Sequence, residues 1–126
     1  MPVRTAHAVW HGDLKGGDGT VALGSGVFEG PYDFRSRFEE GPNTNPDELL
    51  GAAHAACFSM ALANMLAGEG SPPTEVRTEA HVHLGKDDEG AAITKIVLVC
   101  HAKVPGMSAS AWRPRPSAST QRVSCP

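Results

Sequence analysis

Cys57 is the residue of this sequence best suited to chemistry, and it lies within the run GAAHAACFSMAL. A cysteine acts as a nucleophile in its thiolate form, and burial among apolar side chains opposes ionisation. Without a nearby cation, Cys57 would be a small apolar residue of the core, as most buried cysteines are. A catalytic role for Cys57 therefore requires a positive charge close to its sulfur.

Arg37 can supply that charge, since it lies between Phe34 and Phe38 shortly before the cysteine-bearing run. Its guanidinium stays protonated in any surroundings. The other interpretation is a solvated arginine on an edge strand. A partly buried arginine needs an acidic partner, and Asp47 and Glu48 have the right chemistry. These carboxylates would also suit the positive end of a helix dipole, so their position is compatible with both interpretations.

The histidines and Cys100 are weaker candidates for a functional role. His54 precedes Cys57 by three residues, so the two could share a helix face, and a Cys/His pair would indicate a hydrolase. His81 and His83 share one face of a predicted strand, a spacing that can bind a metal, but two histidines are not a complete ligand set. We expect no metal and no cofactor, and we expect Cys100 to be a core residue.

A long helix over residues 46–67 is predicted to carry Cys57. Asn45 suits the N-cap, and Pro46 suits the first helical position, where a missing N–H costs nothing. Gly68 would end the helix in the left-handed conformation. The helix is apolar on every side, which is typical of a buried central helix or a membrane span. Its many alanines and the polar Asn64 favour burial, so we expect no membrane insertion.

The rest of the chain is predicted to form strands. Alternating or short apolar runs bounded by turn residues indicate strands at residues 3–11, 20–23, 32–38, 75–84 and 92–104. The order of three strands, one helix and two strands predicts an α+β fold. In this fold an antiparallel sheet wraps the long central helix.

Composition narrows the functional classes. The chain has 126 residues and a net charge of −3, so one domain is expected and a nucleic-acid partner is not. The N-terminus has no apolar signal region, which favours the cytoplasm. Three cysteines cannot all pair within one chain, and in a reducing compartment they pack or act as thiols.

The chain changes character after residue 106. All 14 acidic residues precede this point, whereas residues 107–126 hold five Ser, three Pro and three Arg and show no periodicity. The prediction is a folded domain over residues 1–106 and a disordered or wrongly read tail over 107–126.

The run from Asn43 to Leu62 resembles the central helix of the OsmC/Ohr family, the osmotically inducible protein C and organic hydroperoxide resistance proteins. The segments AVWHGD at 8–13, FE at 38–39, AITKI at 92–96 and VPG at 104–106 fit the OsmC branch. The resemblance covers about residues 3–107. It implies an intertwined α+β homodimer with active sites at the interface. It also implies a cytoplasmic, thiol-dependent peroxidase that serves in oxidative and osmotic stress.

The resemblance also assigns residue roles. The reactive cysteine of the family matches Cys57, the arginine that holds it as thiolate matches Arg37, and the acidic partner falls on Asp47, with Glu48 next to it. The family's second cysteine lies in a Gly-Cys-Pro-Val type of motif. The cysteine of this chain in that region is Cys125, followed by Pro126. The helix that leads to the motif and the strand that follows it are missing, so Cys125 is a doubtful resolving thiol.

The implied reaction is reduction of a small organic hydroperoxide to its alcohol through a sulfenic acid on Cys57. A disulfide would follow, and an external dithiol such as a lipoylated protein would reduce it. The alternative is a stress protein of the same fold that is catalytically impaired, because the domain is C-terminally incomplete and lacks a proper resolving cysteine.

A reading-frame error would explain the tail. Residues 123–126 are encoded by GTN TCN TGY CCN, and the frame that starts one base later can read TGT CCT GTC, which is Cys-Pro-Val. An Arg122 codon CGG would add the preceding Gly. We therefore expect Cys125 to be an accident of translation, which sequencing of the gene would check.

Overall fold

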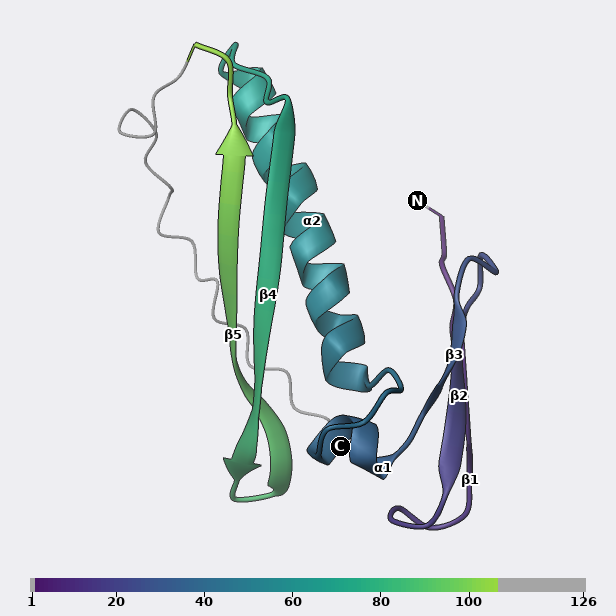
Figure 1. Cartoon of the computed structure of the whole chain (residues 1–126). Helices are drawn as coiled ribbons and strands as arrows, with labels where there is room; N and C mark the ends of the chain where they lie inside the picture. The colour runs from purple at the N-terminus through teal and green to yellow at the C-terminus, as the bar shows by residue number, and fades with distance from the viewer. Residues whose placement is uncertain (1, 107–126) are drawn as a thin grey trace. The chain divides into compact units, whose positions relative to one another are not determined.

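A computed structural model describes residues 2–106 of the chain, and the predicted tail at 107–126 lies outside the described residues. The chain divides after Leu49 into two compact units, each with its own antiparallel sheet. The predicted α+β class is confirmed (Figure 1).

The first unit contains a three-stranded sheet in the order β1-β2-β3. Its strands are β1 (Ala6–His11), β2 (Asp18–Leu23) and β3 (Glu29–Tyr32). The register places Trp10 opposite Gly19 and Gly19 opposite Tyr32. One row across the sheet therefore carries two aromatic residues with a glycine between them.

The predicted strand at 32–38 is wrong beyond Tyr32, because Phe34–Phe38 form the short helix α1. Asp33 and Ser36 make a reciprocal capping box: the Ser36 N–H donates to Asp33 Oδ1 at 2.8 Å, and the Asp33 N–H donates to Ser36 Oγ at 2.9 Å. Phe34 and Phe38 are separated by an even number of positions, so both would lie on one face of a strand. They are also four positions apart, which places them on one face of a helix. Their rings meet on the helix at 4.8 Å.

The long helix α2 (Pro46–Gly68) begins where the sequence predicted. The Glu48 N–H donates to Asn45 Oδ1 at 2.7 Å, which satisfies one of the free donors of the first turn. The end differs from the prediction, because Gly70 and not Gly68 takes the positive φ of 84°. The Gly70 N–H donates to Ala67 O and the Ser71 N–H to Leu66 O, the pattern of a Schellman motif.

The second unit pairs α2 with one long hairpin. The strands β4 (Glu75–Asp87) and β5 (Gly90–Lys103) are antiparallel, and a bulge lies between His83 and Leu84. In Figure 1, α2 runs along this hairpin. Ser59 Oγ lies 2.6 Å from Thr78 Oγ1. A Cβ added at Gly51 would lie 2.9 Å from Val82 Cγ2, so glycine permits a close approach there.

Burial of α2 is one-sided in the single chain, whereas the predicted fold buries the helix within a homodimer. Leu62 and Leu66 are buried and share a helix face with Gly51 and Ser59. The other buried apolar residues are Ala92, Ile93 and Ile96, all on β5. Length and composition alone would let α2 cross a membrane, but the core helices of many proteins pass the same test.

The opposite side of α2 is exposed and mainly apolar. Met60 is 75% exposed, and Cys57, Ala53 and Ala56 are exposed with it. Exposed apolar surfaces are typical of the interfaces at which proteins bind other molecules.

Candidate active site

The first unit holds a largely buried ion pair that joins the last turn of α1 to the first turn of α2. Arg37 Nε on α1 lies 3.5 Å from Asp47 Oδ2 in the first turn of α2, and the side chains are 21% and 10% exposed. The guanidinium carbon also lies 5.3 Å from the centre of the Phe38 ring, within the range of a cation–π contact. The arginine is therefore held by a carboxylate and by an aromatic ring.

Two asparagine side chains connect the segments that carry this pair. Asn45 Nδ2 donates to the carbonyl of Ser36 at 2.9 Å, while Asn45 Oδ1 caps α2. Asn43 Nδ2 donates to Asp33 Oδ2 at 3.0 Å. The segment between α1 and α2 thus fixes both helix starts by local hydrogen bonds, and this brings Arg37 to Asp47.

The ion pair keeps unused hydrogen-bonding capacity. Arg37 Nε and Nη2 and Asp47 Oδ1 are buried and have no hydrogen-bond partner. A guanidinium offers five N–H donors, and buried donors without acceptors are costly. The site is therefore prepared for an added acceptor, such as a thiolate or a ligand oxygen.

Glu48 does not share the role of Asp47 in the structure. Its carboxylate accepts a hydrogen bond from Thr44 Oγ1 at 2.9 Å, and its N–H is capped by Asn45. Of the two acidic residues singled out in the sequence, Asp47 contacts the arginine and Glu48 stabilises the helix start.

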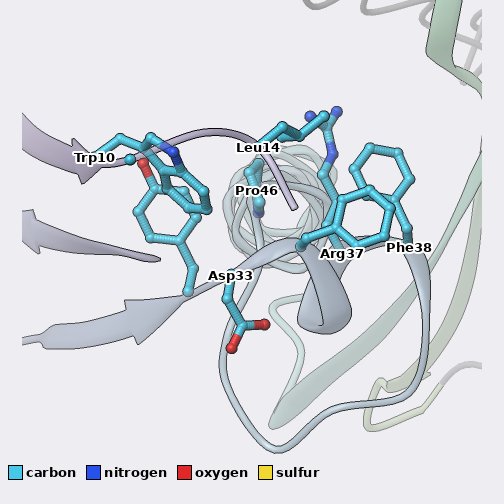
Figure 2. Close-up of a pocket in the computed structure, with 9 residues that line it drawn as sticks. Trp10, Leu14, Asp33, Arg37, Phe38 and Pro46 are labelled. Atoms are coloured by element: carbon cyan, nitrogen blue, oxygen red, sulfur yellow. The ribbon is translucent and has the colours of Figure 1, made fainter. Parts of the chain in front are cut away.

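A pocket of about 420 Å³ lies beside Arg37 in the first unit. Figure 2 shows Trp10 and Phe38 toward opposite sides of it, with Pro46 between them. The lining residues are mainly aromatic or apolar: Trp10, Gly12, Leu14, Tyr32, Asp33, Phe34, Arg37, Phe38 and Pro46. Sequence reasoning found Arg37 but not this pocket, because Trp10, Tyr32 and Pro46 meet through strand pairing and helix docking.

The Asp33 carboxylate is engaged by its own segment. The backbone N–H of Ser36 is the main cause that holds the pKa of Asp33 below its ordinary value of 3.8. Burial is the second-largest influence and raises this pKa, whereas the Ser36 and Asn43 side chains and the charge of Arg35 lower it further. Asp33 therefore stabilises the start of α1.

Cys57 and Cys100 lie in different surroundings, Cys57 on α2 and Cys100 on β5. Cys57 is exposed. Cys100 is half-buried on β5, where the Thr78 hydroxyl donates to its sulfur at 3.6 Å. Because Thr78 also contacts Ser59 on the hairpin side of α2, Cys100 lies under the helix face that Cys57 does not share.

The remaining predicted residues are placed as follows. Arg37 and Cys57 belong to different units, so their juxtaposition stays a prediction. His54 is half-buried and Cys57 is exposed. Within residues 2–106, no three potential metal ligands cluster. His81 Nε2 lies 3.1 Å from Glu79 Oε2. Cys125 lies outside the described residues.

Comparison with known proteins places this site in a family. A profile of the OsmC-like proteins matches residues 39–113. Peroxiredoxin OsmC of Escherichia coli (strain K12) is 53% identical over 110 residues, which cover 86% of this chain and 77% of the relative. The chain belongs to the OsmC-like protein family. The family resemblance inferred from the Asn43–Leu62 run is therefore confirmed.

Solved structures agree with this assignment to the OsmC-like family. An organic hydroperoxide resistance protein OsmC of Legionella pneumophila has a TM-score of 0.58 and 25% identity, and the match covers 87% of this chain and 77% of that chain. The organic hydroperoxide resistance protein OhrB of Bacillus subtilis has a TM-score of 0.57 and 22% identity, with 84% and 76% covered. The second likeness supports the OsmC-like fold alone.

The Asp33 hydrogen bonds of this OsmC-like protein predict a pH dependence. Because the folded pKa lies below the unfolded value, the stabilisation is complete above about pH 3.8 and is lost as pH falls through the folded pKa. The carboxyl-carbon NMR shift of Asp33 should therefore titrate with a midpoint below 3.8, and Asn43→Ala should raise that midpoint. A midpoint at or above 3.8 in the unmodified protein would contradict the described hydrogen bonds.

Proposed function

We propose that this protein is a thiol-dependent peroxidase that reduces organic hydroperoxides to alcohols in the defence against oxidative and osmotic stress. The observation that carries the proposal is the buried Arg37–Asp47 pair, whose free donors suit a thiolate or a peroxide oxygen. The 53% identity to a protein named Peroxiredoxin OsmC supports the same chemistry.

In the proposed reaction the Cys57 thiolate attacks the distal oxygen of the hydroperoxide. The sulfur–oxygen bond forms as the oxygen–oxygen bond breaks, which gives a cysteine sulfenic acid and an alkoxide that takes up a proton. Arg37 stabilises the thiolate before the reaction and the developing alkoxide during it. Asp47 orients the guanidinium and is a positioning residue.

The sulfenic acid must then be reduced by thiols. A second thiol condenses with it to a disulfide and releases water, and an external dithiol restores both thiols by exchange. Dithiothreitol or a lipoylated protein has the required chemistry, and the proposed cycle uses no metal and no organic cofactor. Cys100 is unsuited to resolve Cys57 of its own chain, because it lies under the opposite helix face.

A homodimer is part of the proposal. The exposed apolar side of α2 carries Cys57 together with Met60, and a second copy would remove this surface from water. We place the protein in the cytoplasm, where reducing conditions keep Cys57 available as a thiol.

The cysteines make distinct predictions. Cys57→Ser should abolish consumption of cumene hydroperoxide with dithiothreitol, because the attacking sulfur is gone. Cys100→Ser should keep turnover within a few-fold. Equal loss in both variants would refute the assignment of Cys57. An unmodified protein that consumes no peroxide would indicate the impaired member of the family, and ester hydrolysis lost in Cys57→Ser would indicate the Cys/His hydrolase.

If the protein is a homodimer, its sedimentation mass should depend on protein concentration. Sedimentation at micromolar concentration should show two copies, and Met60→Glu should shift the equilibrium toward the monomer by placing a charge in the interface. Val27→Glu is the matched control, since Val27 is 84% exposed in a loop of the first unit. A folded monomer of the unmodified protein would contradict the dimer.

A further inference from the structure

We propose that the hydroxyl groups of Ser59 and Thr78 set the register of α2 on the β4–β5 hairpin and in this way position the Cys57 thiol for its reaction. Ser59 and Thr78 are positioning residues, because they act through the placement of Cys57. The inference rests on the proposed peroxidase function and adds to it two residues of the second unit.

The two hydroxyls form a directional contact on a mainly apolar side of α2. Ser59 Oγ on α2 lies 2.6 Å from Thr78 Oγ1 on β4, and both residues are half-buried. The fully buried residues on this side of the helix, Leu62 and Leu66, are apolar. Burial of apolar surface is non-directional, whereas a hydrogen bond is made only over a narrow range of distances and angles. The hydroxyl pair therefore specifies one position of the helix along the strand.

A second contact fits the same register. Gly51 on α2 approaches β4 so closely that an added Cβ would lie 2.9 Å from Val82 Cγ2. On the helix, Gly51 and Ser59 are separated by eight positions, about 12 Å at 1.5 Å per residue. On the strand, Val82 and Thr78 are separated by four positions, about 13 Å. The two spacings agree, and in Figure 1 α2 and β4 run in opposite directions, as this pair of contacts requires.

The hydroxyl pair is itself held by both elements. Ser59 Oγ lies 2.9 Å from the carbonyl oxygen of Ala55, one turn earlier on α2. Thr78 Oγ1 lies 3.6 Å from Cys100 Sγ on β5. A chain of polar contacts thus extends from α2 through β4 to β5, and such a network is fully satisfied in one arrangement.

A slip of α2 along β4 would break both contacts. One helical turn is about 5.4 Å, enough to separate Ser59 from Thr78. The loss of a partner for half-buried hydroxyls costs free energy. The residues one turn away from Gly51 all carry a Cβ, so a slip would also bring a larger group against Val82. The observed register is therefore favoured over its neighbours at two points.

The register of α2 decides where the Cys57 sulfur lies. Cys57 precedes Ser59 by two positions, which is about 200° around the helix. This places Ser59 against the hairpin while Cys57 is exposed on another side. A slip of one turn would move the thiol by about 5.4 Å, and a misplacement of about 1 Å can lower a rate about a hundredfold.

The test removes the hydroxyl at position 78 or keeps it. Thr78→Val preserves the shape of the side chain without the hydroxyl, and Thr78→Ser preserves the hydroxyl. We expect Thr78→Val and Ser59→Ala each to lower the second-order rate constant of Cys57 oxidation by cumene hydroperoxide about tenfold. Thr78→Ser should stay within twofold of the unmodified protein. Unchanged rate constants in both Thr78→Val and Ser59→Ala, or an equal loss in Thr78→Ser and Thr78→Val, would overturn the inference.

Two controls exclude general effects of the substitutions. Thr94→Val should keep the unmodified rate constant, since the Thr94 hydroxyl donates to the His83 carbonyl at 3.3 Å within the hairpin. Alanine forms helices better than serine, so a loss of rate in Ser59→Ala would not come from a weaker helix.

Alkylation separates positioning from a change in the thiol itself. At high pH, where thiols are ionised, Cys57 should react with iodoacetamide equally fast in Thr78→Val and in the unmodified protein, as followed by mass spectrometry. This reagent needs only an exposed thiolate. An alkylation rate that falls in parallel with the oxidation rate would overturn the positioning role.

An NMR measurement separates the register from the peroxidase proposal. The nuclear Overhauser effect between the Gly51 α-protons and a Val82 methyl group should be weaker in Thr78→Val than in Thr78→Ser. This result in a protein that consumes no peroxide would support the register and refute the peroxidase. Equal intensities in the two variants, with unchanged circular dichroism, would refute the register.

Discussion

The requirement that a buried guanidinium be neutralised organises the first unit. Arg37 is enclosed between the Phe38 ring and the Asp47 carboxylate, and a charge at this depth is tolerated when it is paired. The pairing needs the end of α1 and the start of α2 to meet, which the Asn45 side chain ensures by bonding to both. The pocket beside the arginine follows from the same arrangement.

The helix that carries Asp47 also carries Cys57, and it is apolar on both of its long sides. The β4–β5 hairpin covers one side, where Leu62 and Leu66 are buried, and Met60 stays exposed on the other. A helix of this composition gains from a cover on each side. The cysteine therefore lies on the surface where the chain has most to gain from a second copy.

Features set by neighbouring residues, such as helix caps, could be predicted from the sequence. Contacts between residues far apart in the chain could not. The start of α2 was read correctly because Asn45 and Pro46 act within one turn. The helix α1 was missed because Phe34 and Phe38 satisfy strand parity as well as the four-residue helical spacing. Arg37 and Asp47 were found through residue type. The pocket was missed, because no short-range signal shows that Trp10 and Tyr32 flank Gly19 across three strands.

We propose that Arg37 holds Cys57 as a thiolate, and the pH profile of Cys57 alkylation measures this effect. In a Cys100→Ser background, Arg37→Ala should move the iodoacetamide profile to higher pH, because an opposite charge nearby favours the ionised thiol. Arg35→Ala is the control on the same helix, since Arg35 is exposed and pairs with Glu39, and it should leave the profile in place. A profile that Arg37→Ala leaves unchanged, in a folded protein, would show that another group activates the Cys57 thiol.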